Sequence, residues 1–151
     1  MPSSIINEVW NAIKTKIAVD YSGGYSGVDL SDRVFQGWFQ DAPLTPSAYI
    51  GFLDQDQQNG TVLTRYQGSI RYQIYCFHYG QNNFERVANA VDLGSDVQNA
   101  LLEDRTLGLA AGRIDNIVCK TAALDGDKFG FSTIGVCVIE VLIQFQSDRG
   151  L

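Results

Sequence analysis

The sequence predicts an α+β domain in which two main helices pack on one face of a mostly antiparallel or mixed sheet of about five strands. Two segments carry apolar residues at helical spacing, several others alternate with the two-residue period of a strand, and two dipeptides typical of hairpin turns separate strand segments. The 151 residues suffice for one such domain. A chain of this size buries ~68–70% of its unfolded surface, so it needs no disulfide or metal to fold.

The first predicted element is an amphipathic helix over residues 5–17, where apolar side chains recur at spacings of three and four. Ser3 or Ser4 can cap this helix. Its apolar face, which we expect to pack on the sheet, comprises Ile5, Ile6, Val9, Trp10, Ile13 and Ile17.

Residues 18–46 differ from the rest of the chain, because glycine, proline and aspartate are frequent there and no regular period persists. We interpret this stretch as an insertion within a single domain of residues 1–151. Long loops of this kind are uncommon and often functional, and Trp and Tyr are enriched where proteins contact partners. Its aromatic residues either fold back onto the core or anchor a partner. The candidate subunit or partner interface comprises Tyr21, Tyr25, Phe35, Trp38 and Phe39.

Strands are predicted after the insertion. Residues 47–53 are expected to form a short strand, and residues 54–60, DQDQQNG, its turn, because Asn-Gly is a strong hairpin signal. Residues 61–79 then run as extended chain. Gly68 interrupts their alternation and is expected to mark a β-bulge.

A second helix is predicted from about residue 83 to residue 104, with Asn82 or Asn83 as its cap. Its apolar residues again recur at helical spacing. Gly94 and Ser95 are the residues at which this helix would kink or split.

The last segment, residues 132–146, has the clearest strand pattern. It reads STIGVCVIEVLIQFQ, is rich in β-branched residues and contains no proline. Successive side chains of a strand point to opposite faces, so its first half should be buried on both sides and its second half on one. We expect it at the centre of the sheet, joined by an Asp-Gly hairpin to a weaker strand at residues 114–124. The face expected to contact the helices comprises Cys137, Ile139, Val141, Ile143 and Phe145.

Patterns typical of catalysis and metal binding are missing from the sequence, which has no GxxxxGK[ST], GxGxxG or HExxH. The single histidine, His78, would have to serve any Ser–His–Asp site, and it continues the apolar face of its strand. Asp54 and Asp56 begin like a calcium loop, but Asn59 replaces the required glycine and Arg65 the required glutamate. We therefore expect no enzymatic activity, no metal and no cofactor.

Charge, hydropathy and cysteine content bear on nucleic-acid binding, membrane association and disulfide formation. The net charge is −6, and no basic patch for gripping nucleic acid is visible. No apolar run is long enough to span a membrane and no signal peptide is visible, so we expect no membrane association. Cys76, Cys119 and Cys137 lie in apolar strand-like segments without a CxxC pair, which is typical of reduced core thiols.

The order and size of these elements resemble the tail terminator proteins of long-tailed bacteriophages. The resemblance covers residues 5–145 apart from the insertion. It rests on the first helix, the strand at 48–53, the long hairpin through 65–77, the helix at 84–104 and two closing strands that end in VCVIEVLIQFQ. It implies no catalytic residues. It implies instead a ring, usually of six subunits, that sits on the end of the tail tube, stops its polymerisation and presents a docking surface to the head.

The same resemblance implies the partners and the location. The partners are further copies of the chain, the tail tube protein and a head-completion or neck protein, and DNA passes through the lumen without specific binding. The location is the tail-neck region of the virion, after assembly in the host cytoplasm. One rival hypothesis is another neck or head-completion ring protein. Another is a small hydrolase or ligand-binding domain with its pocket under residues 18–46, against which the missing nucleophile–base pair counts.

Overall fold

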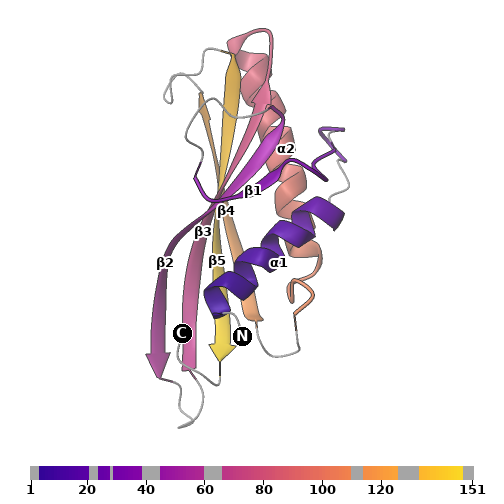
Figure 1. Cartoon of the computed structure of the whole chain (residues 1–151). Helices are drawn as coiled ribbons and strands as arrows, with labels where there is room; N and C mark the ends of the chain where they lie inside the picture. Colours follow the sequence, from indigo (N-terminus) through magenta and orange to yellow (C-terminus); the bar gives the residue numbers. More distant parts are fainter. Residues whose placement is uncertain are drawn as a thin grey trace.

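A five-stranded mixed sheet with two helices on one face forms the domain (Figure 1). The computed structural model describes residues 4–20, 24–27, 29–38, 45–59, 66–109, 114–125 and 133–147. The helices are α1 (Ile5–Asp20) and α2 (Asn83–Glu103). The strands are β1 (Val34–Gln36), β2 (Ser47–Asn59), β3 (Tyr66–Tyr79), β4 (Ile114–Asp125) and β5 (Ile134–Ser147). They follow the order β1-β2-β3-β5-β4; β1 pairs parallel with β2, and the other pairs are antiparallel. The predicted fold class is thus confirmed.

Helix α1 is fixed to the sheet by polar contacts as well as by its apolar face. Ser4 Oγ accepts a hydrogen bond from the Asn7 amide at 3.2 Å, which caps the helix. The indole Nε1 of Trp10 donates to the carbonyl of Ile50 on β2 at 2.9 Å. The hydroxyl of Tyr72 on β3 donates to a carbonyl of the first turn at 2.6 Å. These bonds set how α1 crosses β2 and β3. Its fully buried residues are Val9, Ile13 and Ile17.

Helix α2 runs without a break through Gly94, so the predicted split is wrong. Its cap is Asn82, whose side chain accepts from the Glu85 amide at 2.8 Å. Gly94 lies directly over β5, and a Cβ added there would lie 2.4 Å from Cys137 Sγ. Glycine at this site therefore permits close packing of the helix on the sheet.

Strand β5 has the predicted two-sided burial. The face toward the helices, Cys137, Ile139, Val141, Ile143 and Phe145, is buried in the main core. On the other face Val136 and Val138 are buried, whereas Glu140 and Gln144 are exposed. β5 lies between β3 and β4, and the middle of the five strands is β3. The expectation that β5 holds the centre is corrected in this respect.

Three expectations for the strands are wrong. Residues 54–59 continue β2 and pair with β3 up to Asn59, so they are strand rather than turn. Gly68 pairs in regular register, and the register shifts lie instead at Leu53 and Asp115. The stretch at 18–46 is not all loop, because α1 extends to Asp20 and β1 lies within it.

The three cysteines are free thiols, as expected. Cys76 and Cys137 are register partners on β3 and β5 and are completely buried, while Cys119 is half-buried on β4. Burial raises the pKa of Cys137 to about 11. Neither α1 nor α2 has the length and apolarity needed to cross a membrane.

Candidate interaction surface

A second apolar cluster lies on the outer face of the sheet, which is the face turned away from the helices. Phe77 of β3 and Val136 of β5 are completely buried there, and Val138 is nearly so. Partly buried Tyr49, Tyr75 and Ile134 pack against them. We call these six residues the outer-face cluster. Among the residues that the structure describes, no helix covers this face.

Aromatic rings extend this cluster across β1, β2 and β3. Phe35 stacks on its register partner Tyr49 with ring centroids 4.9 Å apart. Tyr49 in turn meets Phe77 edge-on at 5.7 Å, and Phe77 stacks with Tyr75 at 6.3 Å. Trp38 contacts Tyr75 edge-on at 5.9 Å. Such ring pairs each contribute ~0.5–1.5 kcal/mol beyond their burial, so the rings form a stable surface.

Trp38 is held on this surface by two glycines. Gly37 has φ +106°, a conformation that favours glycine, and its amide donates to the carbonyl of Ile50 at 2.8 Å. The six-membered ring of Trp38 occupies the space where a Cβ of Gly51 would lie, at 2.7–2.8 Å from it. The indole is thus positioned by contact with the backbone of β2, yet 51% of Trp38 is exposed.

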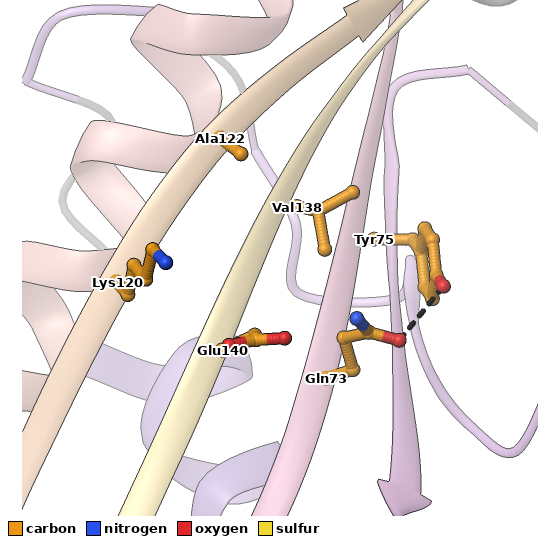
Figure 2. A pocket seen from close by; sticks show the side chains of 6 residues that line it. All are labelled: Gln73, Tyr75, Lys120, Ala122, Val138 and Glu140. Atoms are coloured by element: carbon orange, nitrogen blue, oxygen red, sulfur yellow. Dashed lines mark hydrogen bonds between the residues drawn. The ribbon is translucent and has the colours of Figure 1, made fainter.

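A hollow of about 240 Å³ adjoins the rings on the outer face. It is lined by Gln73, Tyr75, Lys120, Ala122, Val138 and Glu140, which come from three neighbouring strands (Figure 2). The Tyr75 hydroxyl donates to Gln73 Oε1 at 2.8 Å, and burial, with the nearby Glu140 carboxylate, raises the pKa of Tyr75. Pockets for small molecules usually measure ~300–1,000 Å³. The hollow is smaller than this range.

The structure brings only part of the predicted interface together. Phe35 and Trp38 lie on the outer face, whereas Tyr25 lies beside α2 with 69% of its surface exposed. Tyr21 and Phe39 lie outside the described residues. The predicted set is therefore not one cluster among the described residues, and its role in binding stays a prediction.

Sequence reasoning missed Tyr49, Tyr75 and Val138 as members of this surface. The signal that could have found two of them is the odd-numbered face of β3 and the even-numbered face of β5, both apolar near Phe77 and Val136. Tyr49 joins through the pairing of β2 with β3, where Tyr75 is its register partner and Phe77 its ring neighbour, and local pattern alone does not reveal that pairing.

The residues considered for chemistry have structural partners. Arg71 donates two hydrogen bonds to the carboxylate of Asp54, one through Nε at 2.8 Å and one through a second nitrogen. This hydrogen bonding lowers the pKa of Asp54. His78 is half-buried, its Nδ1 accepts from the Tyr79 amide at 2.9 Å, and burial lowers its pKa. Within the described ranges, no three His, Cys, Asp or Glu side chains gather where they could hold a metal ion.

Comparison with known proteins places the fold. No protein-family model matches the sequence, and no curated protein matches it significantly. In three dimensions the chain is similar to a chain of the "Virion of native gene transfer agent (GTA) particle", with a TM-score of 0.65. The similarity covers 97% of this chain and 100% of that chain at 14% sequence identity. At this identity the likeness shows a shared fold.

Proposed function

We propose that this chain is a structural subunit of a phage-like virion, and more specifically a tail terminator. The observation that carries the proposal is the structural likeness to a chain of a gene transfer agent virion, which extends over nearly all of both chains. The order of elements, which resembles that of tail terminators, supports the finer assignment. We propose no enzymatic role, because the fold is similar to that of a virion chain and the aromatic outer face is typical of a surface that contacts other proteins.

The proposed subunit forms a ring, of six copies by the resemblance, that caps the tail tube and stops its polymerisation. An exposed aromatic surface such as that around Trp38 is typical of sites that contact other proteins. Contacts between two different surfaces of one chain generate a ring when the rotation closes. A net charge of −6 per subunit fits a lumen through which DNA passes without binding.

The proposed partners are further copies of the chain, the tail tube protein and a head-completion or neck protein, in the tail-neck region of the virion. A different neck or head-completion ring is the second candidate, since likeness to a virion chain supports it as well.

Electron microscopy of the purified protein with and without tail tubes tests the proposal. The expected result is rings at tube ends and an end to tube growth when the protein is added. Tubes that elongate normally with bare ends would contradict a terminator. Rings that bind only to heads would favour the neck alternative.

A further inference from the structure

Helix α2 carries a second apolar stripe beside its buried one, with Phe84 exposed and Val87, Ala88 and Val91 half-buried. Phe84, Val87, Ala88 and Val91 follow the i, i+3, i+4, i+7 pattern of one helix face, and 82% of Phe84 is exposed. At 3.6 residues per turn, this stripe lies about 135° around the helix from the buried stripe. The buried stripe comprises Ala90, Leu93, Gly94, Val97 and Leu101 among others. We call Phe84, Val87, Ala88 and Val91 the α2 ridge.

The α2 ridge borders an open groove. With Asn83 and Asp92 its residues line an open groove of about 550 Å³. The lining residues that the structure describes all belong to this one helix, and the groove is open. An amphipathic helix that presents apolar residues at this spacing is a common element of protein recognition.

We propose that the α2 ridge of one copy docks on the outer face of the sheet of the next copy, over Ala122 and Val138. This inference rests on the proposed ring and specifies the contact that builds it. The two surfaces are opposed, since α2 packs on one face of the sheet and the hollow lies on the other. A pair joined in this way leaves one free ridge and one free hollow, so further copies can add until a ring closes.

The hollow carries one charge of each sign, because Lys120 and its register partner Glu140 both line it, and one of these charges is opposite in sign to Asp92 beside the ridge. Lys120 borders the hollow on β4, and Asp92 borders the ridge and is exposed. Neither side chain forms an ion pair with any residue in the described part of the chain. Glu140 borders the same hollow on the neighbouring strand (Figure 2), so the ridge must turn Asp92 toward β4 and its apolar residues toward Val138. Like charges opposed across a contact would otherwise cost affinity.

Two variants, each blocked on one surface, test the contact. Ala88→Arg obstructs the ridge, and Ala122→Arg obstructs the hollow; Ala88 is half-buried and Ala122 is exposed. We expect each variant alone to be monomeric by analytical ultracentrifugation, although each melts like the wild type. An equimolar mixture should form a 1:1 dimer that grows no further, because only one intact ridge meets one intact hollow.

Charge reversal is the second measurement and avoids any doubt about folding, because Lys120 and Asp92 are both exposed. Lys120→Glu and Asp92→Lys should each weaken assembly roughly tenfold, and the double reversal should restore it. The inference is overturned if Ala122→Arg alone forms dimers, since ridges would then pair with each other. It is also overturned if the mixture stays monomeric or if wild-type protein stays monomeric at millimolar concentration.

These outcomes separate the inference from the proposed function. Protein that caps tail tubes while both blocked variants assemble normally would refute the contact and keep the function. Protein that assembles through the ridge and the hollow yet leaves tubes uncapped would refute the terminator and keep the contact.

Discussion

The amide and the hydroxyl of Ser26 both donate hydrogen bonds of 2.8 Å to the same carboxylate oxygen of Asp96. The amide of Tyr25 donates to both oxygens of that carboxylate, at 2.9 and 3.1 Å. Asp96 is only 4% exposed, and a buried carboxylate is tolerated where hydrogen bonds satisfy it. The bonds join residues 24–27 to the middle of α2 and leave the Tyr25 ring at the surface.

Asp96→Ala should therefore destabilise the fold by about 3 kcal/mol, because hydrogen bonds to a charged group contribute ~1.5–3 kcal/mol and several are lost together. Urea denaturation measures the loss, and hydrogen exchange should show faster exchange of the Tyr25 and Ser26 amides. Glu103→Ala, which removes an exposed carboxylate of the same helix, is the control and should change stability by less than ~0.5 kcal/mol. Equal effects of the two changes would contradict this role of Asp96.

The two tryptophans should separate folding from assembly. Trp38→Ala should lower the melting temperature only slightly, because half of its side chain is already exposed. It should weaken assembly by ~2 kcal/mol, or roughly thirtyfold. Trp10→Ala is the contrast, with an expected loss of ~3–5 kcal/mol of folding stability. The reason is that the Trp10 side chain packs from α1 against the core and donates a hydrogen bond to the carbonyl of Ile50. A Trp38→Ala protein that is strongly destabilised but assembles normally would contradict this assignment.

Gly94 should not tolerate a methyl group. On an exposed helix face Gly→Ala stabilises by ~1 kcal/mol, but here the new Cβ would overlap Cys137 Sγ, and overpacking costs ~1–3 kcal/mol. We expect Gly94→Ala to lose stability and Cys137→Ala to restore part of it in the double variant. Asn99→Ala on the exposed side of α2 is the control and should be neutral or stabilising. A Gly94→Ala protein more stable than the wild type would show that the helix shifts freely.

Val141→Asp should prevent folding at normal yield, because it buries a charge without a partner among the core residues of β5. The cost is several kcal/mol. Gln144→Asp introduces the same side chain at an exposed position of the same strand and should be tolerated. Soluble expression and circular dichroism compare the two. Folded Val141→Asp protein at wild-type yield would contradict the burial of Val141 in the core.

Alkaline pH should weaken the fold through the buried thiols. Burial raises the pKa of Cys137 from 9.0 to about 11 and also raises that of Cys76. The folded state therefore holds these protons at a pH where the unfolded chain releases them, so their contribution is complete below pH 9.0 and declines from pH 9.0 to about 11. Urea midpoints across this range measure the decline, which should be shallower for Cys137→Ala. An identical slope in both proteins would mean that the Cys137 thiol does not take part.

Local pattern was sufficient for the elements that bury one continuous face. Strand β5 and both helices are long, and their apolar residues repeat with the period of the element, so the sequence predicts their type and the residues that contact each other. The polar residues 54–59 have no such period and are strand because β3 pairs with them through a long hairpin. The bulges at Leu53 and Asp115 likewise depend on pairing and carry no glycine that would mark them.

The candidate surface was less predictable, because it depends on which strands become neighbours. Strand β1 has three residues, and its parallel pairing with β2 is what stacks Phe35 on Tyr49. Trp38 reaches Tyr75 only because Gly51 leaves room for its ring. Tyr25, grouped with them by its place in the insertion, is instead held at α2 by Asp96.

The free cysteines, which differ in burial, can also report how fast different parts of the fold open. Cys76 and Cys137 are sealed between the helices and the sheet, so an alkylating reagent reaches them only when the helices separate from the strands. Cys119 is half-buried on β4, the outermost strand on that side, and reacts when this edge alone frays. Mass spectrometry of partially alkylated protein would thus give two alkylation rates in one sample, one that reports opening of the sheet edge and one that reports opening of the core. The native cysteines serve as the probes, so no substitution has to be introduced for the measurement.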